Sequence, residues 1–349
     1  MDKSLLVFEK YVRSEVTKKV YTYWFGRFLK WTKIKDASGL LQLKDSFLQS
    51  MVEDYVMYIR TRISPNSMNP VIASLQLFFS MNDKVLNWQR IRRMIPEKVK
   101  KAGYMAYQTE DIKKMLEGEP LRNKALIHFL ASTGMRVGGL EGLKLKHLVE
   151  MPENTRAVEV YSDTNSSYWC FLSNESCKVF DEYINERRKN GEYINGESPC
   201  FRTRYQVGIE KSKMMSIKSI HLVLNRIVKK IDRKKVGNRR YNFMAAHSIR
   251  KRYSTIVKSN ANIPYSVGER LLGHQAYLDA SYFRPTRENL WLEWKKITNE
   301  LTVDSSAKEQ LRREEAEQEI KKLKDEKDKR IAELEAKIDN LFDMITKKD

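Results

Sequence analysis

Helical periodicity in the first part of the chain is the feature that most constrains its fold. Between residues 17 and 31, apolar side chains recur at steps of three and four, as they do along one face of an α-helix. The positions between these apolar residues include the basic residues Lys18, Lys19, Arg27 and Lys30. The same spacing predicts further helices over residues 47–62 and 68–81. We therefore expect residues 1–95 to form a compact helical domain with a basic surface.

One β-rich region interrupts the helical pattern further along the chain. Residues 157–161 and 168–172 are rich in β-branched and aromatic side chains, and Ser-Asp-Thr-Asn-Ser-Ser separates them. Two such runs around a turn-forming segment indicate a β-hairpin. Helical periodicity returns on both sides of the hairpin, for example over residues 121–133 and 177–189. The expected fold class is therefore mainly α with a small β-sheet.

Shifts in composition divide the chain into four parts. Residues 96–108 contain Pro, Gly and a lysine cluster with few apolar anchors, which is typical of an interdomain linker. We predict a helical domain over residues 1–95, then this linker, then a mixed α+β domain over 109–303. A charged helical tail is expected over residues 304–349.

The tail carries an apolar stripe with heptad spacing. The stripe alternates gaps of three and four residues and consists of Ile331, Leu334, Ile338, Leu341 and Ile345. Ile320 and Leu323 continue it upstream, but Lys327 interrupts it and shifts its phase by four residues. Two structures remain open for this segment, a short coiled coil and a solvated single helix.

The net charge points to a polyanionic partner. Lys and Arg exceed Asp and Glu by 20 over the whole chain. The tail from Ala307 onward has 12 basic and 13 acidic residues, so the excess lies in the preceding domains. Such a charge distribution is the electrostatic footprint of a nucleic-acid-binding protein, although a generally basic protein remains the alternative.

Apolar runs and cysteines indicate the compartment. No apolar run approaches the length of a membrane span, so we expect no membrane partner. The cysteines are Cys170, Cys177 and Cys200. Their number is odd and their spacing does not suit a metal site, so we expect free thiols in a cytoplasmic protein.

Two arginines, two histidines and a tyrosine occur in an order that suits phosphodiester chemistry. They are Arg136 in Ala131-Ser-Thr-Gly-Met-Arg-Val-Gly, His247 and Arg250 in Ala246-His-Ser-Ile-Arg, His274 in Leu271-Leu-Gly-His, and Tyr282 in Ala280-Ser-Tyr-Phe-Arg-Pro. An arginine keeps its charge, and its planar fork matches two phosphoryl oxygens. Imidazoles move protons, and a tyrosine oxygen can act as a nucleophile. Each motif is weak alone, and Arg136 has the alternative of a structural ion pair with Glu141.

In this order and spacing, the set resembles the tyrosine recombinase (phage-integrase) family. The resemblance covers about residues 109–303, and Ser281-Tyr-Phe-Arg-Pro-Thr resembles the archaeal integrases of the family. The segment beginning Thr17-Lys-Lys-Val-Tyr is similar in kind to the opening helix of the family's core-binding domain. The resemblance implies a helical core-binding domain that clamps DNA, followed by an α+β catalytic domain.

The resemblance also implies a function. It implies a site-specific recombinase that cleaves and rejoins double-stranded DNA through a 3′-phosphotyrosyl intermediate, as a homotetramer and without a metal or other cofactor. Arg136 and Arg250 would clamp the phosphate, and Tyr282 would be the nucleophile. His247 and His274 would handle protons and contact the phosphate.

The chain departs from the family pattern at three points. Tyr282 follows His274 by eight residues where many family members have nine, so Tyr277 is a competing nucleophile. Gly139 stands where the family usually has an acidic residue. The hairpin turn lacks the family's lysine, which donates a proton to the leaving oxygen. Candidates for that role elsewhere are Lys144, Lys146 and Lys178.

Basic residues around the linker are the best-placed candidates for contacts with DNA phosphates. They are Arg90, Arg92, Arg93, Lys98, Lys100 and Lys101. Two other functions remain open. One is nicking and closing of DNA by an enzyme similar to type IB topoisomerases, and the other is non-catalytic DNA binding on a decayed recombinase fold.

Overall fold

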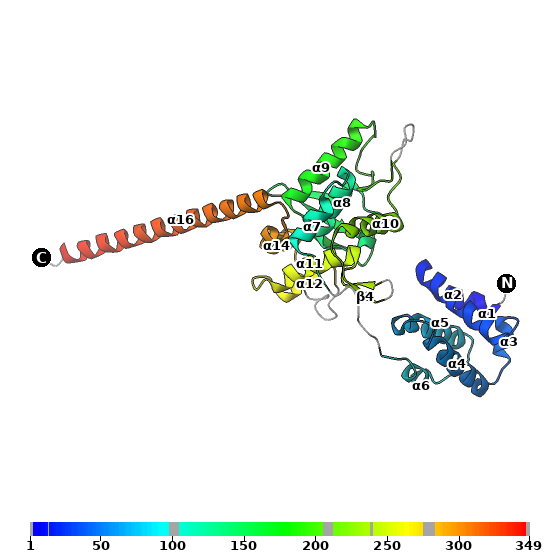
Figure 1. The fold of residues 1–349 in the computed structure, drawn as a ribbon. Coiled ribbons are helices and arrows are strands. Elements are labelled where there is room, and N and C mark those ends of the chain that lie inside the picture. Colours follow the sequence, from blue (N-terminus) through cyan, green and yellow to red (C-terminus); the bar gives the residue numbers. More distant parts are fainter. Residues whose placement is uncertain are drawn as a thin grey trace. The chain divides into compact units, whose positions relative to one another are not determined.

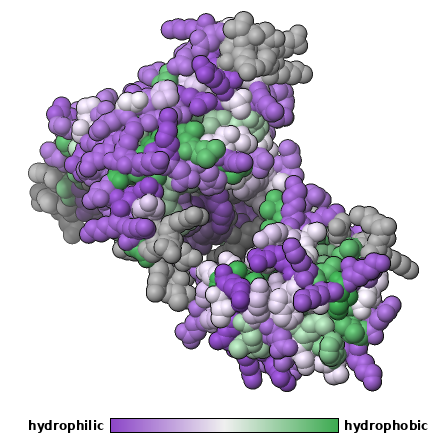
Figure 2. Space-filling model, turned by 45° about the vertical axis from the view of Figure 1, so that its right-hand side comes forward, coloured by the Kyte–Doolittle hydropathy of each residue, from purple (hydrophilic) through white to green (hydrophobic). Residues whose placement is uncertain are grey.

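The chain forms two compact units, Met1–Lys100 and Lys101–Asp349 (Figure 1). The computed structural model describes residues 3–12, 14–97, 105–204, 212–237, 240–274 and 283–346. Both units are mainly helical, which confirms the predicted fold class. None of the helices in these ranges is both long and apolar enough to cross a membrane. Hydrophilic residues cover most of the face drawn in Figure 2.

The first unit is a helical bundle. Its elements are α1 (Lys3–Lys10), α2 (Glu15–Thr32), α3 (Ala37–Leu41), α4 (Asp45–Arg60), η1 (Pro65–Ser67), α5 (Met68–Met81) and α6 (Trp88–Arg93). Helix α5 is the most apolar of them and packs against α1 and α2. Between α2 and α5, the ring centroids of Phe25 and Phe78 lie 4.0 Å apart. Phe25 and Phe28 of the predicted stripe are buried in this core, whereas Val20 of the stripe is exposed.

The second unit is built around helix α8. Its helices are α7 (Thr109–Leu116), α8 (Leu121–Thr133), α9 (Asn174–Lys189), α10 (Ile217–Ile227), α11 (Ala245–Ser259), α12 (Tyr265–Leu271), α14 (Arg287–Lys295), α15 (Thr298–Leu301) and α16 (Ser305–Thr346), with 3-10 turns η2 (Val137–Leu140), η3 (Leu145–His147) and η4 (Val228–Lys230). Its strands are β1 (Leu148–Met151), β2 (Thr155–Val160), β3 (Tyr168–Leu172), β4 (Lys235–Gly237) and β5 (Arg240–Tyr241). Every residue of α8 from Ala125 to Thr133 is buried, because α7, α9, α11 and β3 all pack against it.

The sheet β1-β2-β3 is antiparallel and is covered on both faces. Val158 pairs with Cys170, and both side chains enter the core formed with α8 and α9. Their neighbours Ala157 and Phe171 point to the opposite core, where Phe171 contacts Trp294 of α14 at 5.4 Å between ring centroids. The predicted hairpin is confirmed as β2 and β3. Strand β1 was not predicted, since its four residues are too few for a clear alternating pattern.

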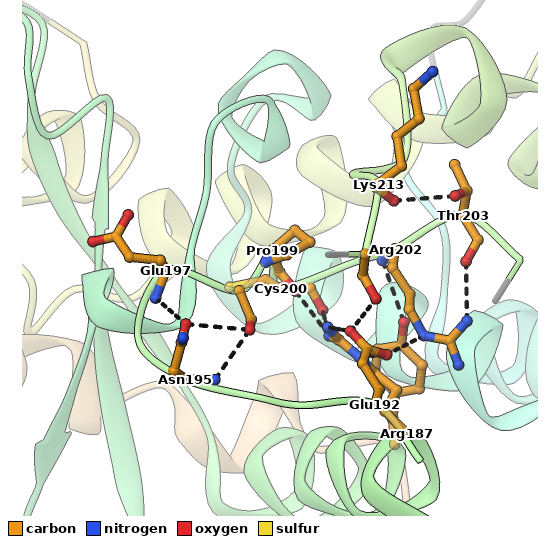
Figure 3. Close-up of polar contacts among 12 residues, drawn as sticks. Arg187, Glu192, Asn195, Glu197, Pro199, Cys200, Arg202, Thr203 and Lys213 are labelled. Atoms are coloured by element: carbon orange, nitrogen blue, oxygen red, sulfur yellow. Dashed lines mark hydrogen bonds and ion pairs between the residues drawn. The ribbon is translucent and has the colours of Figure 1, made fainter. Parts of the chain in front are cut away.

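A buried ion cluster braces the end of α9 (Figure 3). Glu192 lies between two arginines, 2.6 Å from Nη2 of Arg187 and 2.6 Å from Nε of Arg202. Arg187 also donates to the carbonyl oxygen of Pro199 at 2.8 Å. Breaking such a buried pair costs about 3–5 kcal/mol, because one charge is left without compensation. The cluster therefore fixes residues 199–203 against α9.

The root of the tail, residues 300–304, is hydrogen-bonded to the rest of the second unit. Glu175 accepts hydrogen bonds from the backbone nitrogens of Val303 and Asp304 at 2.9 and 2.8 Å. Arg252 donates to the carbonyl oxygen of Glu300 at 2.6 Å. From there α16 runs as one helix of 42 residues, and its apolar residues Ile320, Leu323, Ile331 and Leu334 are exposed. Self-association through this stripe remains a prediction.

Candidate active site

Arg250 lies at the centre of the candidate site. It sits on α11, is 7% exposed, and forms three bonds with two neighbouring segments. Its Nη1 donates to the carbonyl oxygen of Gly134 at 2.7 Å, and its Nη2 donates to that of Leu272 at 2.6 Å. Nη2 also lies 2.9 Å from Nε2 of His274. Burial and the nearby charge of Arg136 lower the pKa of Arg250, but a guanidinium stays charged throughout the physiological range. The guanidinium therefore ties the ends of α8 and α12 to α11.

A glycine turn presents Arg136 at the end of α8. Gly134 has a left-handed φ of 58°, and a Cβ there would lie 2.2 Å from the ring of Tyr253 on α11. Only glycine therefore lets α8 end this close to α11. Two residues later, Arg136 is exposed and forms no ion pair with any residue in the described ranges. The alternative ion pair with Glu141 is thus absent.

The imidazole of His247 lies beside these arginines and is only partly exposed. It lies three residues before Arg250 in the first turn of α11. Partial burial lowers the pKa of His247, and the positive charges of Lys251, Arg250 and Arg136 lower it further. The imidazole is therefore neutral at pH 7 and has a lone pair that can accept a proton.

His274 occupies the turn after α12. Gly273 has a φ of 62°, and a Cβ there would lie 2.5 Å from the ring of Tyr168 on β3. The turn thus packs directly on the sheet and carries His274 toward Arg250. On its other side, the Nδ1 of His274 lies 2.8 Å from a carboxylate oxygen of Glu269. No sequence motif pointed to Glu269, which lies five residues before His274 and is separated from it by the end of the helix.

Tyr282 and its competitor Tyr277 both lie outside the described residues. The residues that flank this stretch are nevertheless fixed by α12. The backbone nitrogen of His274 donates to the carbonyl oxygen of Glu269 at 2.9 Å, and Arg270 donates to that of Phe283 at 2.7 Å. The residue that follows Tyr282 is therefore anchored to the helix that positions His274.

Two departures from the family pattern, at Gly139 and at the missing hairpin lysine, can be related to local contacts. A Cβ on Gly139 would lie 2.6 Å from both Met135 and Val160, so no acidic side chain fits at this position. Lys144 and Lys146 each form an ion pair of 2.7 Å with Glu197. The third candidate, Lys178, lies on α9 beside the root of α16. Within the described ranges, none of these lysines bonds with the four basic residues of the site.

The candidate DNA contacts on α6 are partly engaged within the first unit. Arg90 forms an ion pair of 2.9 Å with Glu53, and Arg92 donates to Gln76 at 2.6 Å. Both remain exposed, as does Arg93. The other three candidates, Lys98, Lys100 and Lys101, lie outside the described residues.

The sequence profile of the phage integrase family matches residues 105–283, which is more than half of the chain. The chain belongs to the phage integrase family. The matched range contains Arg136, His247, Arg250, His274 and Tyr282. Membership in the family therefore covers the whole candidate site. No curated protein matches the chain in sequence.

Solved structures of integrases share the fold. A lambda integrase tetramer bound to a Holliday junction has a TM-score of 0.53 at 17% identity, covering 81% of this chain and 76% of that one. The Tn1549 transposon integrase in complex with transposon right-end DNA has a TM-score of 0.55 at 14% identity, covering 84% and 98%. The XerH recombinase in a post-cleavage complex with a palindromic difH substrate has a TM-score of 0.54 at 15% identity, covering 80% and 78%. These identities are low, so the comparisons establish the phage integrase fold alone.

Proposed function

We propose that the protein is a site-specific DNA recombinase that cleaves and rejoins DNA through a 3′-phosphotyrosyl intermediate. One observation carries the proposal. Arg136, His247, Arg250 and His274 come from three separate segments of a phage integrase fold, and Arg250 links these segments by hydrogen bonds. The anchored Phe283 is the direct neighbour of Tyr282, the proposed nucleophile.

The proposed reaction balances without water or an external energy source. The Oη of Tyr282 attacks the phosphorus and the bond to the 5′ oxygen breaks, which leaves a 3′-phosphotyrosyl link and a free 5′ hydroxyl. The tyrosine proton passes to a base, and a second proton reaches the leaving oxygen. Rejoining is the reverse step, with a 5′ hydroxyl as the nucleophile. The covalent link conserves the energy of the phosphodiester bond.

The cations of the site supply the electrostatic stabilisation of this step. Negative charge grows on the phosphoryl oxygens in the transition state, and Arg136 and Arg250 would meet it with fixed N–H donors. Removing one such donor costs on the order of a hundredfold to a thousandfold in rate. His247 is the proposed base because its pKa is lowered and its imidazole is neutral at pH 7. The candidate donors of the second proton are Lys144, Lys146 and Lys178.

Double-stranded DNA is the proposed partner, bound at specific attachment sites by a homotetramer. The basic excess of the chain supports a DNA partner. Residues 1–95 would form the core-binding domain, with the exposed arginines of α6 on DNA phosphates. We further propose that the enzyme is an integrase of the archaeal type, that it comes from a virus or plasmid, and that it is cytoplasmic. The first of these rests on Ser281-Tyr-Phe-Arg-Pro-Thr.

Covalent capture of DNA tests the proposal. The purified protein is incubated with a library of nicked duplexes of random sequence. A nick just beyond the cleavage site lets the short fragment with the free 5′ hydroxyl escape, which traps the covalent intermediate. We expect adducts that survive SDS in the wild type and in Tyr277→Phe, and none in Tyr282→Phe. Duplex binding should persist in all three, because only a hydroxyl is removed. An adduct in Tyr282→Phe would contradict the assignment of the nucleophile.

Sequencing of the captured DNA separates the alternative functions. A recombinase should yield one sequence with two inverted half-sites, because its protomers act in pairs. An enzyme similar to type IB topoisomerases should yield unpaired, variable sequences. A non-catalytic DNA-binding protein should give no adduct with any variant.

A further inference from the structure

A chain of charged contacts leads from the candidate site into α11 and α12. Arg250 Nη2 lies 2.9 Å from His274 Nε2, and His274 Nδ1 lies 2.8 Å from Glu269 Oε2. The other oxygen of Glu269 lies 2.7 Å from Nζ of Lys258 on α11. Lys258 in turn lies 5.5 Å from the ring centre of Tyr265 at the start of α12. The carboxylate of Glu269 is therefore fixed from two sides.

The directions of these hydrogen bonds follow from the chemistry of the groups. An arginine has only donors, so Nε2 of His274 accepts and carries no proton in this arrangement. A neutral imidazole then carries its proton on Nδ1 and donates it to Glu269. The carboxylate thus selects the tautomer whose Nε2 lone pair faces Arg250. The opposite tautomer would set an Nε2 proton against the guanidinium and a lone pair against the carboxylate.

Glu269 is built to stay ionised in this role. Partial burial acts to raise the pKa of Glu269, but the hydrogen bonds from Lys258 and His274 outweigh it and hold the pKa below its ordinary value. The side chain of Glu269 is 13% exposed, against 33% for that of His274. Water therefore competes less for the carboxylate than for the imidazole. The backbone nitrogen of His274 also donates to the carbonyl oxygen of Glu269 at 2.9 Å. The side chain and the backbone of Glu269 therefore both bond to His274.

We propose that Glu269 is a positioning residue that fixes the tautomer and ring orientation of His274. The inference rests on the proposed function, in which Arg250 clamps the scissile phosphate and His274 lies beside that arginine. A ring that is held on Nδ1 keeps the lone pair of Nε2 directed at the guanidinium of Arg250 and so holds the arginine in position for the phosphate. Glu269 itself touches neither. Its contribution passes through His274 alone, as that of a carboxylate behind a metal-ligating histidine does.

The first test measures the tautomer directly and does not depend on cleavage. The chain has five histidines, so ¹⁵N-labelled imidazoles give a small set of signals, and His274→Gln assigns one of them. We expect the proton of His274 on Nδ1 in the wild type and a shift toward Nε2 in Glu269→Ala. An unchanged tautomer in Glu269→Ala would overturn the inference, whatever the activity of the protein.

The second test measures single-turnover cleavage on a captured nicked duplex. Glu269→Ala should lower the rate on the order of tenfold to a hundredfold. Glu269→Gln keeps an acceptor for Nδ1 and should retain much more of the rate. Glu293→Ala is the matched control, since it removes a carboxylate of α14 that lies 2.8 Å from Lys296, and it should leave the rate unchanged. Equal losses in Glu269→Ala and Glu293→Ala would overturn the inference.

A double substitution separates positioning from general destabilisation. If Glu269 acts only through His274, Glu269→Ala should have no further effect in a His274→Gln background. The same fold-loss in both backgrounds would mean that Glu269 acts by another route. Failure of the wild type to form any adduct would instead refute the proposed function, and the tautomer measurement would still decide the role of Glu269.

Discussion

Nη1 of Arg250 donates a hydrogen bond of 2.7 Å to the carbonyl oxygen of Gly134, although 116 residues separate the two in sequence. Gly134 ends α8, and Arg136 follows it by two residues. The bond therefore fixes the positions of Arg136 and Arg250 relative to each other. The contact depends on the absence of a side chain at Gly134, where the ring of Tyr253 fills the space of a Cβ. Gly134, two residues before Arg136, thus decides how the cations of the site are spaced.

We expect Gly134→Ala to be more destabilising than Gly118→Ala. Both glycines have a left-handed φ, of 58° and 63°, but a Cβ on Gly118 meets no atom within 4 Å. The backbone strain alone costs about 1–2 kcal/mol, and the clash with Tyr253 should add about 1–3 kcal/mol at Gly134. Urea unfolding of both variants measures the difference in the free energy of unfolding. Equal losses would mean that Tyr253 moves aside at no cost.

Arg136→Lys should lower cleavage almost as much as Arg136→Ala, on the order of a hundredfold or more. An ammonium keeps the charge but loses the planar fork that matches two phosphoryl oxygens. Single-turnover cleavage of a nicked duplex provides the measurement. Arg330→Lys in α16 is the control and should be neutral, since Arg330 is exposed and belongs to the tail. Cleavage at the normal rate by Arg136→Lys would exclude bidentate clamping by Arg136.

The second-order rate of cleavage should fall on the acidic side, with the midpoint of this fall below pH 6.5. The proposed base, His247, must be neutral to accept the tyrosine proton, and the neutral form prevails above its pKa. Partial burial and the charges of Lys251, Arg250 and Arg136 hold the pKa of His247 below the ordinary 6.5. His247→Gln should lose this acidic limb and lower the rate on the order of a hundredfold. A limb centred above pH 7 would contradict the assignment of His247.

Truncation after Ala307 should leave cleavage intact and weaken assembly on DNA. The cut keeps the bonds from Glu175 to Val303 and Asp304, which fix the root of the tail. It removes the apolar stripe, of which Ile331 and Leu334 are exposed. As a short seam, the stripe would associate only when protomers are already gathered on DNA. Analytical ultracentrifugation of protein–DNA complexes compares the full and truncated chains. Identical assembly would mark α16 as a solvated helix.

The sequence by itself determined the local structure and the set of candidate residues. The stripe of α2 and the runs that form β2 and β3 are patterns within about 15 residues, and they fix helix and hairpin because their periods match those structures. The order of the arginines, histidines and tyrosine pointed to the family before any contact was known. Strand β1 escaped, since a four-residue strand acquires its identity from the partner that it pairs with.

Only the tertiary structure decided which of these residues meet and what supports them. The bond between Gly134 and Arg250, the carboxylate of Glu269 behind His274, and the absence of space at Gly139 all join segments that no periodicity relates. The tertiary structure also shows that Arg136 and Glu141 form no ion pair, and that Lys144 and Lys146 both pair with Glu197. The physical reason is that packing brings distant segments into contact, whereas a sequence pattern records only the neighbours that a residue has along its own helix or strand.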